Sequence, residues 1–138
     1  MKRALILTAI LALALVGCSG KKPNPTLTPT QSSSRPSSTG HIEILAPLPG
    51  AIVKGSETIV KVKLTGAHIV KAASTNLKPD EGHIHVKLDG VTKTLLANLE
   101  YNLTGLTPGP HLLEVEFAAS DHGPFEPRVL EQSSFTDE

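Results

Sequence analysis

Histidines are the residues of this chain whose type and spacing could support chemistry. Four of the six, His83, His85, His111 and His122, lie in short stretches rich in glycine, proline and aspartate. Side chains at positions i and i+2 of a strand project from the same face, about 6.6 Å apart along the chain. His83 and His85 can therefore converge on one ion, and imidazole is a suitable ligand for Zn²⁺, Cu²⁺ or Ni²⁺.

A metal site built on this pair needs a third ligand, and the candidates are His122, Asp121 and His111. His111 alternates with large apolar residues, so its side chain is predicted to point into the protein. The histidine pair shares its strand face with Lys87 and is predicted to point outward. If both predictions hold, His111 points inward while His83 and His85 point outward, which complicates a shared site, and His122, Asp121 and His111 all remain candidates for the third ligand.

The same histidines also have a structural interpretation, which is the simpler one. His83 can hydrogen-bond loop backbone at the start of its strand, and His111 can fill a corner position with a ring nitrogen bonded to a buried carbonyl. His122, between an aspartate and a glycine, can brace a turn. The sequence leaves the structural and the metal-binding interpretations open.

Catalytic signatures are scarce. The chain has no Gly-x-Ser-x-Gly elbow, no glycine-rich phosphate loop and no His-Glu-x-x-His helix motif. Asp80 and Glu81 are adjacent, which sends them to opposite sides of an extended chain and argues against a paired-carboxylate site. We therefore predict no catalytic residues and no enzymatic activity.

The elements that carry the histidines are predicted to be strands. Apolar and polar residues alternate with a period of two, and glycine and proline separate the segments, with Asp89-Gly90 as a hairpin-type turn. This pattern predicts an all-β fold, an antiparallel two-sheet sandwich of about seven strands. The domain has no cysteine, so core burial alone must hold it together. The candidate strands are 41–45, 58–64, 83–88, 91–95, 99–103, 111–117 and 128–135.

The N-terminal part has a different composition. Lys2 and Arg3 precede a hydrophobic segment, residues 4–16, which is the arrangement of a secretory signal and is too short to span a bilayer, since a spanning helix needs ~20 apolar residues. Residues 19–40 are rich in serine, proline and threonine, which predicts a flexible tether. The predicted organisation is a signal peptide (1–17), a linker (18–40) and one domain (41–138).

The end of the signal, Leu15-Val16-Gly17-Cys18, resembles the lipobox of bacterial lipoproteins. The resemblance implies cleavage before Cys18 and a lipid on its thiol, so that the membrane is contacted through an acyl anchor. Ser19, where inner-membrane lipoproteins tend to have aspartate, implies the outer membrane in a diderm host, or otherwise the outer face of the plasma membrane. An ordinary signal peptide with a chance cysteine, or a retained signal anchor, is the alternative.

The domain also resembles a set of uncharacterised exported bacterial immunoglobulin-like domains. These carry Gly-His-x-His, Pro-Gly-x-His and Asp-His-x-Pro motifs, matched here by segments 82–85, 108–111 and 121–124. The resemblance implies a fold and a location in the cell envelope, without an established activity. The absence of tryptophan and of a cysteine pair departs from antibody domains.

Charge narrows the possible partners. Residues 41–138 contain eight Lys or Arg against thirteen Asp or Glu, so the domain is acidic and nucleic acid is not expected as a partner. We favour a non-enzymatic binding or scaffold module that has an envelope protein as its partner and no cofactor. A lipoprotein that binds Zn²⁺ or Cu²⁺ through His83 and His85 is the first alternative. An enzyme acting on envelope polysaccharide or peptidoglycan is the second.

Overall fold

The computed structural model describes residues 34–96 and 98–138. The predicted signal peptide, Cys18 and most of the predicted linker lie outside these residues. Within the described ranges, no helix is long and apolar enough to cross a membrane. The described residues form nine strands: β1 (His41–Ala46), β2 (Ile52–Val53), β3 (Glu57–Thr65), β4 (His68–Ile69), β5 (Glu81–Leu88), β6 (Val91–Leu96), β7 (Glu100–Thr104), β8 (Gly109–Ala119) and β9 (Val129–Asp137).

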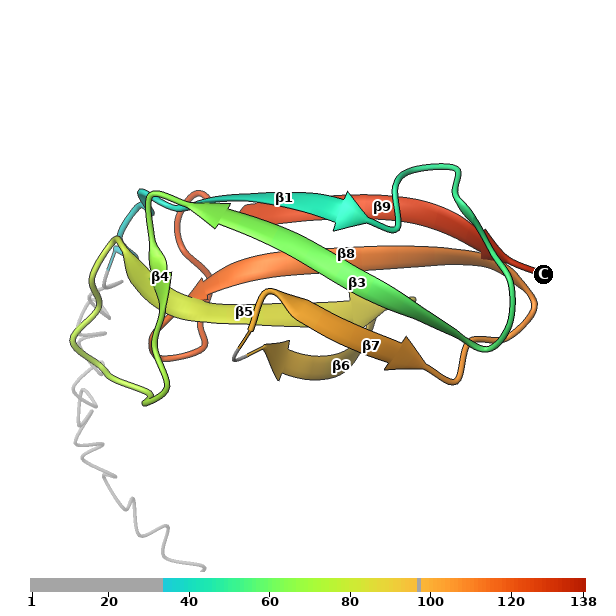
Figure 1. Cartoon of the computed structure of the whole chain (residues 1–138). Coiled ribbons are helices and arrows are strands. Elements are labelled where there is room, and N and C mark those ends of the chain that lie inside the picture. The colour runs from blue at the N-terminus through green and yellow to red at the C-terminus, as the bar shows by residue number, and fades with distance from the viewer. Residues whose placement is uncertain (1–33, 97) are drawn as a thin grey trace, which may run out of the picture. The chain divides into compact units, whose positions relative to one another are not determined.

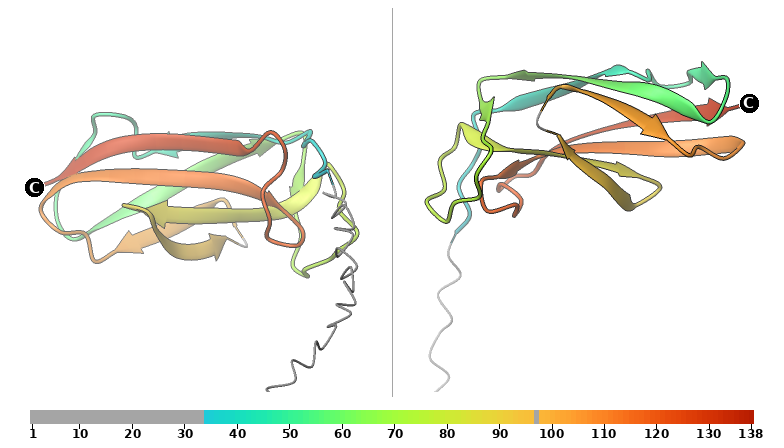
Figure 2. Two further views of the ribbon diagram at one scale, coloured as in Figure 1. Left: turned by 180° about the vertical axis from the view of Figure 1, so that it is seen from behind. Right: turned by 60° about the horizontal axis from the view of Figure 1, so that its bottom comes forward.

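The strands form two sheets that lie over one another, as the two orientations in Figure 2 show. One sheet has the order β1-β3-β7, and the other has the order β2-β9-β8-β5-β4, with β6 also paired to β5. The longer strands pair antiparallel, as β1 and β3 do in Figure 1. The short strands β2 and β4 pair in parallel with β9 and β5. The prediction of an all-β, two-sheet sandwich is confirmed, and each of the seven predicted segments overlaps one of the longer strands.

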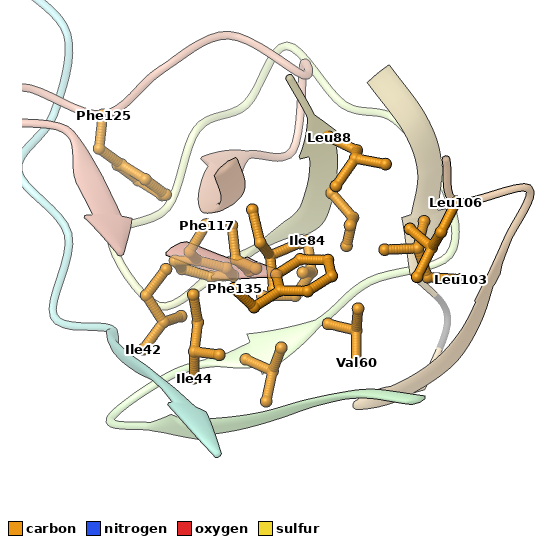
Figure 3. Packing of buried hydrophobic residues seen from close by; sticks show 14 of the residues in the cluster. Ile42, Ile44, Val60, Ile84, Leu88, Leu103, Leu106, Phe117, Phe125 and Phe135 are labelled. Atoms are coloured by element: carbon orange, nitrogen blue, oxygen red, sulfur yellow. The ribbon is translucent and has the colours of Figure 1, made fainter. Parts of the chain in front are cut away.

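The core lies between the two sheets and consists of the apolar side chains that alternate along the strands. Phe117, Phe125 and Phe135 are fully buried or nearly so, and the rings of Phe117 and Phe125 stack with centroids 5.4 Å apart. Figure 3 shows Phe117 and Phe135 facing Ile42 and Ile44 from the opposite sheet. Each such side chain contributes about 1.5–3 kcal/mol when it is removed from water. Aromatic and aliphatic burial therefore takes the place of the disulfide of antibody domains.

Residues 34–40 carry no regular strand but lie against the domain. Ser38 and Thr39 bond the carbonyl of Pro79, and the hydroxyl of Thr39 also donates to the carbonyl of Gly66. A Cβ on Gly40 would come 2.9 Å from the Phe117 ring, so the chain passes directly over the core at this point. The end of the predicted linker is thus held at the pole of the sandwich where β1 begins (Figure 1).

Candidate functional site: a histidine cluster on the outer sheet face

His83 and His85 project from the outer face of the six-stranded sheet. Their cross-strand neighbours on β8 are Ala118 and Glu116, whereas the intervening Ile84 is fully buried in the core. The predicted alternation of this strand is therefore observed. His83 is nevertheless only 6% exposed, although it points away from the core. A loop that crosses the outer face covers it.

This covering segment is the β8–β9 loop, residues 120–128. Its residue His122 has a positive φ of 65°, and its ring stacks on that of His83 with centroids 4.1 Å apart and planes 15° apart. His83 Nε2 lies 3.2 Å from the carbonyl oxygen of Ser120. Because a carbonyl only accepts hydrogen bonds, Nε2 is the protonated nitrogen of His83. The loop and the strand thus hold each other through two histidines.

His85 completes what we call the histidine cluster, consisting of His83, His85 and His122. His85 Nε2 lies 3.4 Å from His122 Nδ1, and the two ring centroids are 5.6 Å apart. Burial lowers the pKa of His83 and that of His85, and the neighbouring imidazoles lower both further. Both rings are therefore kept neutral near pH 7, which is the form that binds metals.

Asp121, the carboxylate considered as a third ligand, is engaged elsewhere. Both of its oxygens accept hydrogen bonds from the guanidinium of Arg35 at 2.8 Å. Arg35 also donates to the carbonyl of Pro124, and the Gly123 amide donates to Asp121 Oδ1 at 3.0 Å. These bonds hold the pKa of Asp121 well below its usual range, with Arg35 as the main cause. Asp121 therefore fixes the loop to the N-terminal segment, and both of its oxygens are engaged there.

His111 lies apart from the cluster, at the other end of β8. It is five residues along the strand from Glu116, the partner of His85, which is about 17 Å at 3.4 Å per residue. Its ring points inward as predicted and contacts Phe135, with centroids 5.4 Å apart. The structure therefore removes His111 from any set of ligands that includes His85.

The two ring nitrogens of His111 have partners that only accept. Nδ1 lies 2.7 Å from Asp89 Oδ2, and Nε2 lies 2.7 Å from the carbonyl oxygen of Thr107. Two acceptors require two protons, so the ring is an imidazolium. The bond to Asp89 raises the pKa of His111, and the buried Asp137 adds a further negative charge nearby. His111 ties the β5–β6 turn to the start of β8.

Residues that sequence reasoning did not single out surround the cluster. Glu116 is 5% exposed and accepts two bonds from Arg128, at 2.8 and 2.6 Å. Lys87 donates to Glu114 at 2.9 Å on the same face. The alternation of Glu116 and Lys87 with buried residues along their strands could have indicated that they share the outer face with the histidines. Nothing in the sequence near Arg35 indicates its role, because its partner Asp121 is 86 residues away.

Two further observations define the limits of the site: what is missing from the histidine cluster, and a depression that lies elsewhere on the domain. In residues 34–96 and 98–138, no group of three or more His, Cys, Asp or Glu side chains is arranged to hold a metal ion. A depression of about 290 Å³ lies between segments 38–42 and 127–131 and includes His41 and Glu131 in its lining. It shares no residue with the histidine cluster, so the two are separate features.

Comparisons with known proteins complete the description. The sequence matches no protein-family model and no curated protein. Among solved structures, the fibronectin(III)-like modules of Clostridium thermocellum CbhA align with a TM-score of 0.48 and 12% identity, over 70% of this chain and 96% of that one. An engineered protein aligns with a TM-score of 0.47 and 12% identity, over 72% of this chain, which spans about a fifth (20%) of that protein. The strand order of this chain is that of an all-β sandwich of two sheets.

Proposed function

We propose that this chain is a non-enzymatic interaction module of the cell envelope, held at a membrane by a lipid on Cys18. The sequence supports the anchor through the signal and the resemblance of segment 15–18 to a lipobox. The fold supports a binding role, because a two-sheet sandwich with a filled core presents rigid loops at its two ends. The partner is an envelope protein.

The observation that carries this proposal is that the N-terminal segment and an exposed apolar pair lie at opposite ends of the domain. Residues 34–40 are held at the pole where β1 begins, and the β1–β3 loop and the C-terminal end of β9 lie at the opposite pole (Figure 1). The β1–β3 loop displays Leu48, which is 58% exposed, and Ile52, which is 61% exposed. A module tethered at one pole carries this apolar pair on the other.

The loop that carries Leu48 and Ile52 is held firmly in place. The Gly50 amide donates to the carbonyl of Ser134 at 2.8 Å, and the Ser133 hydroxyl donates to the carbonyl of Pro47 at 2.7 Å. β2 is also paired with β9. A preorganised loop loses little conformational entropy on association, which favours binding by its exposed side chains.

Cross-linking in cells tests the binding role. A photoreactive residue at position 48 or 52 is expected to give a discrete adduct with one envelope protein. Val91 is the matched control, because it is also apolar and 60% exposed but lies at the start of β6, which is separated from β2 by β9, β8 and β5 within the six-stranded sheet. Adducts that are absent at 48 and 52, or equally abundant at 91, contradict the proposal.

A separate experiment tests the anchor. The mature chain, produced in cells from the full sequence, is expected in the membrane fraction with a diacylglyceryl mass on its N-terminal Cys18, and Cys18→Ala is expected to lose both. An unmodified thiol on freely soluble mature protein would refute the lipid anchor and leave the cross-linking result intact.

A further inference from the structure

The histidine cluster has a geometry that suits a metal ion better than a hydrogen bond. His85 Nε2 and His122 Nδ1 are 3.4 Å apart, which is longer than the usual donor–acceptor distance of about 2.7–3.2 Å in a hydrogen bond donated by an N–H group. Two nitrogens bound to one tetrahedral ion at 2.0–2.1 Å are about 3.3–3.4 Å apart. Adjacent ligands of a square-planar ion at the same bond length would be only about 2.8–3.0 Å apart. The observed spacing is that of a tetrahedral ion.

From this spacing we infer that His85 Nε2 and His122 Nδ1 bind Zn²⁺, with the remaining coordination positions open to water or to an oxygen ligand. The site goes beyond the interaction role proposed above and does not depend on it. Two protein ligands make an open site, and this agrees with the lack of a three-residue metal group in the part of the chain described. Imidazole nitrogen is a preferred ligand of Zn²⁺.

Both ligands are held by structure that is independent of the metal. His85 lies within β5, which is paired with β8 on one side and β6 on the other. The backbone amide of His122 donates a hydrogen bond to the Ala119 carbonyl at 2.8 Å, and the Asp121–Arg35 ion pair lies next to it. These two interactions fix His122 in its left-handed conformation. A non-glycine residue at positive φ is uncommon and marks a constrained position. The loop is therefore organised to place this imidazole over the strand.

His83 has a different role in the same cluster. Its Nε2 proton is committed to the Ser120 carbonyl, and its ring lies flat against that of His122. A ring stacked face to face on a ligand does not direct its own lone pair at the ion that this ligand binds. We assign His83 as a positioning residue that fixes the orientation of His122, in the way that outer-shell contacts orient metal ligands.

Binding also requires a defined arrangement of protons. In the metal-free pair, the proton between His85 Nε2 and His122 Nδ1 belongs to one ring, and both nitrogens must offer lone pairs to the ion. That proton moves to the other nitrogen of the same ring when Zn²⁺ binds, so a change of tautomer frees both lone pairs. The exposed side of the pair gives an ion access, because His122 is exposed and His85 is half-buried.

Calorimetry with ZnCl₂ tests the two ligands. The full chain carries Cys18→Ser, which removes its single thiol, and is kept in detergent. One equivalent of Zn²⁺ is expected to bind, and His85→Gln and His122→Asn should each weaken binding by about 100-fold or more, at or beyond the upper end of the effect of outer-shell changes. Asparagine tolerates the positive φ at position 122, so the loop is retained. His41→Gln, at an exposed histidine on β1, is the matched control and should bind as the parent does.

Long-range ¹H–¹⁵N spectra of the imidazoles test the individual atoms. One equivalent of Zn²⁺ should shift Nε2 of His85 and Nδ1 of His122, and Nε2 of His83 should keep its proton. His83→Phe preserves a flat ring against His122 and should retain the affinity, whereas His83→Ala should lower it about 10-fold. No binding by the parent chain, or unchanged binding by the His85 and His122 variants, overturns the site. Metal-type shifts at His83 overturn its assignment as a positioning residue.

Discussion

The folding stability of this domain should pass through a maximum near pH 6.5, because folding raises the pKa of His111 and lowers those of His83 and His85. Asp89 raises the pKa of His111 above its unfolded value of about 6.5. The unfolded chain therefore releases this proton first as the pH rises. The stability contributed by the His111 imidazolium is complete below pH 6.5 and is lost as the pH rises through the folded pKa.

The size of this loss follows from the hydrogen bonds of His111. A neutral imidazole donates only one proton, so either the Asp89 carboxylate or the Thr107 carbonyl loses its donor. A hydrogen bond to a charged group contributes about 1.5–3 kcal/mol. For a domain of this size, a loss of ~2 kcal/mol corresponds to a decrease of roughly 8–16 °C in Tm. Between pH 6.5 and 9 the unfolding free energy should therefore decrease by about 2 kcal/mol.

Below pH 6.5 the histidine cluster reverses the trend. Burial lowers the pKa of His83 and His85, so the unfolded chain binds protons that the folded chain does not. Stability is then lost as the pH falls from about 6.5 toward their folded pKa values. The two limbs involve different residues and can be separated by mutation.

Urea denaturation of the domain, residues 34–138, at intervals from pH 5 to 9 measures both limbs. Asp89→Asn removes the charge that holds His111 protonated, and its amide can still pair with a neutral imidazole. This variant should lose the decrease above pH 6.5 and keep the decrease below it. A parent curve that is flat or rising from pH 6.5 to 9, or a variant with the same slope as the parent, refutes the assignment of His111 as an imidazolium.

Three further predictions concern packing. Gly82→Ala places a Cβ 2.1 Å from the Ala118 carbonyl in the β5–β8 ladder, so the pairing must shift and the urea midpoint should fall sharply; an unchanged midpoint would contradict this. Phe117→Ala should lower the unfolding free energy by about 3–5 kcal/mol in the same assay, and a loss below 1 kcal/mol would show that the site collapses around the gap. Arg35→Ala should speed hydrogen exchange at the Glu126 amide, which donates to the Pro36 carbonyl, with a global loss of about 1 kcal/mol or less. Unaltered exchange at this amide would mean that the N-terminal segment is held without the ion pair.

The sequence predicts the seven longer strands because each is a run of five or more residues bounded by turn residues, and period-two alternation is clearest in β3 and β5. β2 and β4 escape prediction, since two residues are too few to show a period. Both pair in parallel with strands distant in the chain, β9 and β5, so they exist through tertiary contact. Local pattern therefore predicts the sandwich and not its complete edges.

The site is predictable only in part for the same physical reason. Strand parity correctly separates His111 from His83 and His85, because side-chain direction is a local property of a strand. The burial of His83 depends on where the β8–β9 loop folds, and that depends on Arg35 bonding Asp121 across 86 residues. The loop shows one local sign of its purpose, a histidine followed by glycine and proline, but its position over β5 has no local cause.

The histidines of this domain show how environment assigns a role to a residue type. His111 is on the inward face of β8 with a carboxylate and a carbonyl at its two nitrogens, so the charged ring is the stable form and its lone pairs are unavailable. His85 is on the outward face of β5, where burial outweighs the attraction of Glu116, so the neutral ring is the stable form and a lone pair remains for binding. A metal ion can bind only a histidine of the second kind, one that is neutral and has a free lone pair, as His85 is. The outer face of the six-stranded sheet is therefore where a metal ion can bind, because the β8–β9 loop brings the imidazole of His122 within 3.4 Å of that of His85.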